Sequence, residues 1–128
     1  MVAVELSKQR TRWEKLPILD RAKLNRTAGG DPEFAREVLW VYFASMPVAL
    51  KRLWNALSKE DTSDLRYRAR LTKSSCEAVG AQRLAAILLS LEMALDVGDA
   101  EFVAQLVSDE LEHVKSEADR LGLLSSPS

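Results

Sequence analysis

The sequence has little of the residues that build disulfides, metal sites and flexible linkers. Its 128 residues include one cysteine, Cys76, and one histidine, His113. A lone cysteine cannot form an internal disulfide, which favours a reducing compartment such as the cytoplasm. A lone histidine excludes multi-histidine metal sites, and we expect no metal and no cofactor. Five glycines and four prolines exclude collagen-like and linker-dominated chains.

Long apolar runs and a strong net charge are also missing. The longest uncharged, apolar-rich stretch, residues 38–50, is too short to span a bilayer, and the N-terminus lacks the pattern of a secretory signal. The formal net charge of −1 gives no general attraction to nucleic acid. We therefore expect no membrane and no nucleic-acid partner. With 47% hydrophobic residues, the chain is long enough to bury the core of one globular domain.

Helix start and stop signals divide the chain into helix-length pieces. Asp20, Asp31 and Asp61 each stand where they can cap a helix, and Pro32 takes the first helical position after Asp31. They predict helices over residues 20–28, 31–58 and 61–79. Two more follow over 82–97 and 99–121, with Gly98-Asp99 closing the first and capping the second. No segment alternates with the period of a strand.

These elements predict an all-α fold, an up-down-up-down antiparallel four-helix bundle with a short additional N-terminal helix. Residues 1–15 form an N-terminal arm or a helical extension, residues 16–122 the bundle, and residues 123–128 a disordered tail. Each long helix carries an apolar stripe at helical spacing. The last three stripes are Leu65, Ala69, Thr72, Cys76 and Val79; Leu84, Ile87, Leu88, Leu91 and Leu95; and Phe102, Leu106, Leu111, Val114, Ala118 and Leu121.

The helix over 31–58 differs because its first half has two apolar faces. One stripe includes Leu39 and Met46, and a second consists of Phe34, Val38, Val41 and Tyr42. The simplest interpretation is that the short helix and the arm cover the second stripe. The alternative is an exposed apolar patch that binds a protein.

Catalytic and metal-binding patterns are weak. Glu110 and His113 have the Glu-x-x-His spacing of di-iron bundles, but such a site needs a second motif of the same kind, so His113 is interpreted as a surface residue. Cys76 lies in an apolar stripe and is interpreted as a core residue. The sequence has no phosphate-binding loop and no nucleophile elbow. We therefore predict that the protein is not an enzyme.

The outward face of the helix over 61–79 is basic. Arg66, Arg70 and Lys73 stand at positions i, i+4 and i+7, well away from the apolar stripe. Ser74 and Glu77 share that side, and Tyr67 and Leu71 flank Arg70. The simplest interpretation is a solvated face on which Glu77 pairs with Lys73.

This stretch resembles a known family, the bacterial histidine-phosphotransfer (HPt) domains. Their typical motif is Ala-His-x-Leu-Lys-Gly-x-Ser-x-x-x-Gly-Ala, and this chain reads Ala69-Arg70-Leu71-Thr72-Lys73-Ser74-Ser75-Cys76-Glu77-Ala78-Val79-Gly80-Ala81. The similarity continues through Arg83-Leu84-Ala85, Leu91-Glu92 and Gly98-Asp99, and upstream through Gly29-Gly30-Asp31. It covers residues 16–121, and it implies a four-helix bundle that binds receiver domains.

The sequence departs from the family at the reactive position. Arg70 stands at the position of the phosphoacceptor histidine, and Ser74 replaces the usual glycine. Arginine stays cationic and has no lone pair with which to attack a phosphoryl group, so phosphotransfer is not expected.

The resemblance implies a protein that docks on the receiver of a response regulator or hybrid histidine kinase and modulates a phosphorelay without carrying phosphate. The residues expected to dock are Arg66, Arg70, Leu71, Lys73, Ser74, Glu77 and, on the preceding helix, Tyr42. The alternative is a structural bundle that kept the fold and binds an unrelated protein or itself. We expect a monomer, with a dimer as the other possibility.

Overall fold

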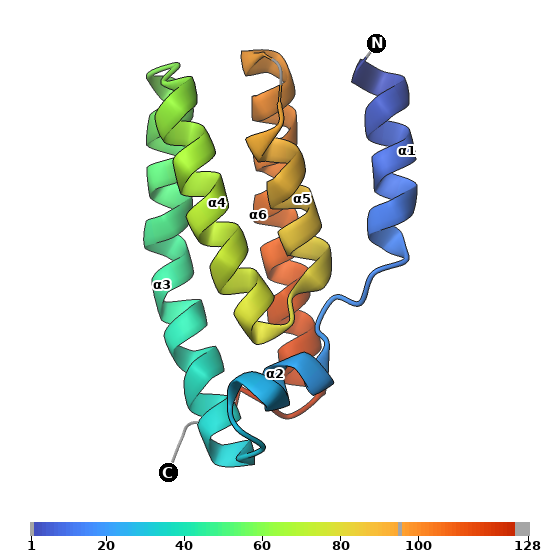
Figure 1. Cartoon of the computed structure of the whole chain (residues 1–128), viewed down its shortest axis with the longest axis vertical. Helices are drawn as coiled ribbons and strands as arrows, with labels where there is room; N and C mark the ends of the chain where they lie inside the picture. Colours follow the sequence, from blue (N-terminus) through green and yellow to red (C-terminus); the bar gives the residue numbers. More distant parts are fainter. Residues whose placement is uncertain (1, 95, 125–128) are drawn as a thin grey trace.

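The chain is all-helical over the residues that its structure, a computed structural model, describes: 2–94 and 96–124 for the backbone and 8–94, 96 and 98–124 for the side chains. The helices within these ranges are α1 (Val2–Glu14), α2 (Arg21–Thr27), α3 (Pro32–Ser58), α4 (Thr62–Val79), α5 (Gln82–Glu92) and α6 (Val97–Arg120) (Figure 1). None of the helices in these ranges is long and apolar enough to cross a membrane.

Helices α3 to α6 stand side by side, α2 crosses their lower end and α1 stands beside α5 (Figure 1). Helix α4 packs between α3 and α5, and α6 packs against both α5 and α3. Large apolar side chains from these helices fill the space between them, among them Leu39, Met46, Leu84, Leu88, Val107 and Val114. The described part of the chain is therefore a helical bundle with one core.

Aspartate caps begin α2, α3 and α4, as the sequence predicts. The Asp20 carboxylate accepts the backbone N–H groups of Ala22 and Lys23, and the Asp31 carboxylate those of Glu33 and Phe34. The Asp61 carboxylate accepts the backbone N–H group of Asp64 in the same way. Each cap satisfies backbone donors that have no partner within the first turn of a helix.

The predicted boundary between the last two helices was wrong. Helix α5 ends at Glu92, and the cap of α6 is Asp96, whose carboxylate accepts the N–H of Asp99 at 2.8 Å. Gly98 lies inside the first turn of α6 instead of ending a helix. Asp96 and Asp99 are equally good caps by residue type, so the sequence alone does not choose between them. Leu95, predicted to belong to the stripe of α5, lies outside the described residues.

The apolar stripe of α6 was also partly wrong. Val103 and Val107 are buried in line with Leu111 and Val114, at spacings of four, four and three residues. The Phe102 side chain, predicted to be in the stripe, is 49% exposed. Its position is one residue out of phase with the buried face, so the ring points toward solvent.

The N-terminal segment is a helix, which decides between the two predicted alternatives. Trp13 of α1 is buried, and Gln9 accepts the Ser90 hydroxyl of α5. The Arg83 guanidinium of α5 donates to the carbonyl oxygens of Trp13, Glu14 and Leu16. These contacts fix the end of α1 and the turn after it onto the bundle.

Two residues of the predicted C-terminal tail belong to the folded part of the chain. The Leu123 side chain is buried, and its N–H donates to the carbonyl oxygen of Ala118. Leu124 packs against the core. These two residues belong to the folded part because they add apolar contacts to it, and the rest of the predicted tail, 125–128, lies outside the described residues.

Full coverage of the second stripe of α3 was wrong. Phe34 is 47% exposed and Val41 is 68% exposed, and the neighbouring Trp40 is 46% exposed. Helix α2 has seven residues and contacts only part of α3. An apolar surface therefore remains on the first half of α3.

Candidate functional site

The outward surface of α4 carries most of the residues that the sequence predicts to form a docking site. The predicted stripe of Leu65, Ala69, Thr72, Cys76 and Val79 is buried. The opposite side carries the residues that we call the docking face: Arg66, Tyr67, Arg70, Leu71, Lys73, Ser74 and Glu77. All of these are exposed except Lys73, which is half-buried.

Arg70 and Lys73 share one carboxylate, that of Glu92. The Arg70 Nε atom lies 3.0 Å from Glu92 Oε1, and the Lys73 Nζ atom lies 3.4 Å from Glu92 Oε2. We call these three residues the Arg70–Lys73–Glu92 cluster. The Arg70 side chain remains 64% exposed, whereas that of Glu92 is only 15% exposed. Lys73 thus pairs across to α5, and the predicted pairing of Lys73 with Glu77 was wrong.

Glu92 is held in its charged form by these cations. The hydrogen bond from Arg70 is the main cause that lowers the pKa of Glu92 below its ordinary value, and Lys73 adds to it. Glu92 is the last residue of α5, where the partial negative charge of the helix end disfavours a carboxylate. The two cations of α4 offset that unfavourable placement.

Beside Arg70, the surface between α3 and α4 forms a shallow groove. Its volume is about 380 Å³, and it is lined by Ser45, Met46, Val48, Ala49, Arg52, Arg68, Leu71, Thr72 and Ser75. The exposed Val48 and Leu71 side chains give it apolar walls. The Ser74 and Ser75 hydroxyls donate back to carbonyl oxygens of α4, one turn earlier. The docking face therefore has a cationic centre and an apolar flank.

Tyr42 does not belong to this surface, contrary to the sequence prediction. Its side chain is 4% exposed, and its Oη atom lies 3.2 Å from Cys76 Sγ in the core. Burial raises the pKa of the Tyr42 hydroxyl and raises the pKa of the Cys76 thiol to about 12. On α3, Tyr42 points between α3 and α4, so its side chain is not accessible from the docking face.

His113 lies on the surface of α6, as predicted. Its Nδ1 atom is 2.8 Å from Glu110 Oε2, and its side chain is 60% exposed. Glu110 is itself buried, and its other carboxylate oxygen lies 3.8 Å from Arg83 Nε. Within the described ranges no three His, Cys, Asp or Glu side chains come together as metal ligands.

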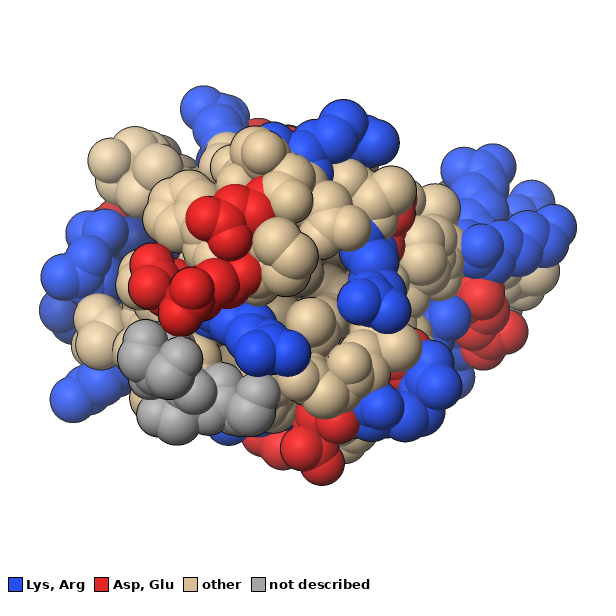
Figure 2. Space-filling view, turned by 90° about the horizontal axis from the view of Figure 1, so that it is seen from below, with Lys and Arg blue, Asp and Glu red and all other residues tan. Residues whose placement is uncertain are grey.

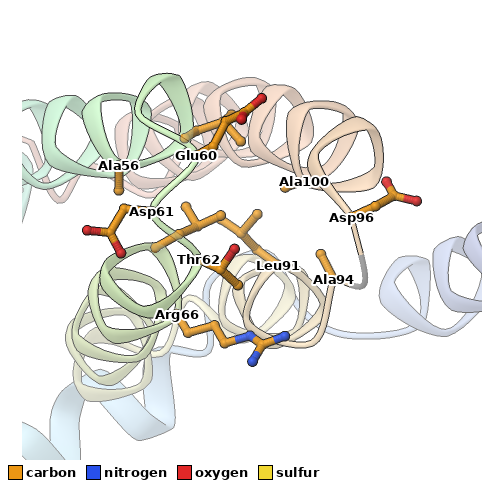
Figure 3. A pocket seen from close by; sticks show the side chains of 11 residues that line it. Ala56, Glu60, Asp61, Thr62, Arg66, Leu91, Ala94, Asp96 and Ala100 are labelled. Carbon is orange, nitrogen blue, oxygen red and sulfur yellow. The ribbon is translucent and has the colours of Figure 1, made fainter.

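A hollow of about 250 Å³ lies at the end of the bundle where α3 turns into α4 (Figure 3). Leu57, Leu65 and Leu91 contribute apolar lining. Asp61 and Asp96 lie on opposite sides of it (Figure 3). Both are helix caps whose carboxylates accept backbone N–H groups. These two carboxylates thus have structural roles.

Charges of both signs are spread over the end of the molecule that α2 crosses, opposite the α3–α4 turn. In Figure 2, Lys and Arg side chains gather at the right-hand side, where α1 stands in Figure 1, and acidic groups lie between other cations. No one-signed surface covers that end as it is drawn.

No known family model matches the sequence, and neither a curated protein nor a solved structure is detectably similar to it. The resemblance to HPt domains therefore depends on the residues quoted above.

Proposed function

We propose that this chain is an HPt-like, up-down-up-down four-helix bundle that docks on the receiver domain of a response regulator or hybrid histidine kinase. It modulates phosphorelay signalling in the cytoplasm without carrying phosphate. The observation that supports this proposal most is the exposure of Arg70. Its guanidinium stands on the outward face of α4, in the middle of the motif that resembles the phosphoacceptor segment of HPt domains.

The chemistry of Arg70 suits binding and excludes phosphoryl transfer. A guanidinium has five N–H donors and no free lone pair, so it cannot act as the nucleophile that histidine provides. The resemblance implies a partner pocket of acidic residues around the phosphorylated aspartate. A cation that enters this pocket contributes orientation and association rate. Leu71 and the groove beside it offer the apolar contact area that a stable interface needs.

The test is a binding titration against a panel of purified receiver domains at low and moderate salt. We expect selective binding by the wild-type protein and weaker binding by Arg70→Ala. Arg120→Ala, which removes an exposed cation of α6, a helix that packs against α3 and α5, serves as the matched control and should bind like the wild type. Arg70→His should gain the ability to accept phosphate from a phosphorylated receiver. Absence of binding by every variant would refute the proposal.

The second candidate function is self-association or binding of an unrelated protein through α3. The exposed Phe34, Trp40 and Val41 side chains favour it. Sedimentation velocity over a wide concentration range is the test. A mass that rises with concentration in the wild type but not in Val41→Ser would support this candidate. Leu89→Ser, which changes an exposed leucine of α5, is the control and should self-associate like the wild type.

A further inference from the structure

In the Arg70–Lys73–Glu92 cluster, the negative charge of Glu92 weakens the attraction of the two cations for an acidic partner. We propose that Glu92 determines the specificity of the docking face. Its carboxylate occupies the two cations that a partner's carboxylates would engage, so it restrains docking to partners acidic enough to compete with it. This inference rests on the proposed function and adds a residue from another helix to the site.

The contacts show that Glu92 is fully engaged. Each carboxylate oxygen has its own cation, Arg70 Nε at 3.0 Å and Lys73 Nζ at 3.4 Å. Arg70 uses only its Nε–H for this pair, and within the described residues its two Nη groups make no hydrogen bond. An incoming carboxylate therefore finds donors on the outer edge of Arg70 and a negative charge directly behind them.

The position of Glu92 in its helix is a second and independent observation. An acidic residue at the C-terminal end of a helix is unfavourable, and a neutral or basic residue is preferred there. Local rules of this kind are broken mainly at functional sites. Glu92 gives no benefit to its own helix, and its interactions are with the cations of α4.

The charges of the cluster predict whether replacing Glu92 tightens or weakens the binding of an acidic partner. Arg70 and Lys73 carry two positive charges, and Glu92 removes one of them. Replacing Glu92 by glutamine leaves both cations free to attract an acidic pocket. Because Arg70 is largely exposed, solvent screens the pair, and we expect Glu92→Gln to tighten binding by about two- to fivefold.

The experiment is a titration of purified, unphosphorylated receiver domains with Mg²⁺, using the full chain in four forms. These are the wild type, Glu92→Gln, Glu77→Gln and the double variant Arg70→Gln/Glu92→Gln. Glu77→Gln is the matched control because it removes one exposed negative charge from the same face without freeing Arg70. We expect tighter binding by Glu92→Gln, a smaller gain by Glu77→Gln, and loss of the gain in the double variant.

The outcomes separate the inference from the proposed function. If the wild type binds a receiver and Glu92→Gln binds equally or more weakly, Glu92 positions Arg70 or plays no part, and the inference is wrong. If neither form binds any receiver, the proposed function itself fails. A readout without a partner is the Arg70 Nε–H signal in ¹⁵N NMR, which should move in Glu92→Gln. An unchanged signal would show that the pair does not form in solution, which overturns the inference.

Discussion

At the scale of single residues, Gly80 connects two distant parts of the chain. It has φ = +85°, and its carbonyl oxygen accepts the N–H of Asp20 at 2.8 Å. A Cβ atom at this position would lie 2.4 Å from the backbone oxygen of Asp20. The turn between α4 and α5 therefore has two reasons to require glycine: the left-handed backbone and the close approach of the segment before α2.

We predict that Gly80→Ala lowers the free energy of unfolding by about 2–4 kcal/mol, because both the backbone and the Asp20 contact must shift. Urea denaturation followed by circular dichroism measures the change. Gly29→Ala is the control, since Gly29 has φ = +65° but nothing within 4 Å of a Cβ atom. It should cost only about 1–2 kcal/mol. Equal losses in the two variants would contradict the argument.

Glu92 gives a prediction about pH. Its pKa is lowered in the folded protein, mainly by Arg70, so its contribution to stability is fully present above the pKa of the unfolded chain, about 4.3. That contribution is lost as the pH falls through the lower, folded-state value. Urea unfolding of the wild type and Glu92→Gln should therefore differ by a constant amount at neutral pH and converge below about pH 4. A difference that does not change down to pH 3 would refute this assignment.

At the scale of elements, Arg83 holds α1 and the turn after it against the rest of the bundle. It donates to three carbonyl oxygens of residues 13–16 and lies near the buried Glu110 of α6. One side chain thus connects the N-terminal segment, α5 and α6. Two of these oxygens, those of Trp13 and Glu14, belong to the last residues of α1, whose carbonyls lack partners within the helix, and the third, that of Leu16, lies in the turn after it.

We predict that Arg83→Met destabilises the protein by about 2–4 kcal/mol, because it removes several hydrogen bonds and leaves the buried Glu110 carboxylate with His113 as its one remaining partner among the described residues. Hydrogen exchange should show faster opening of α1 than of α4. The double variant Arg83→Met/Glu110→Gln should regain part of the loss, since it buries no unpaired charge. No recovery would mean that the Arg83–Glu110 pair contributes little.

Helix starts were predictable from the sequence where a single aspartate stands at the position of the cap. The capping aspartates Asp20, Asp31 and Asp61 set the starts of three helices correctly. The α5–α6 boundary was not predictable because Asp96 and Asp99 compete as caps. In the candidate site, the outward position of Arg70 follows from helical spacing alone. Its pairing with Glu92 does not, because the contact depends on how α4 and α5 pack against each other.

At the scale of the whole molecule, the core isolates the single cysteine. Cys76 is fully buried, and its thiol has a pKa of about 12 and contacts Tyr42. Thiol reagents attack the thiolate form, and only where they have access. The reactivity of Cys76 should therefore depend on opening of the bundle.

We predict that a disulfide reagent modifies Cys76 very slowly in the native protein and rapidly in urea. Absorbance of the released thiol chromophore follows the reaction. Gly80→Ala should accelerate native labelling by the factor by which it raises the population of the opened state, which grows exponentially with the lost free energy of unfolding. Rapid modification of the stable wild type would show that the core opens locally around Cys76.

The contact between Asp20 and the α4–α5 turn has a consequence during synthesis of the chain. Helix α2 has seven residues, which is too short to be stable in isolation. Besides the cap bonds within α2, its capping residue Asp20 has long-range partners in Gly80 and in Gln82, which lies 62 residues later. During synthesis, α2 can therefore become stable only after the α4–α5 turn has been translated. The N-terminal part of this protein thus folds after the middle.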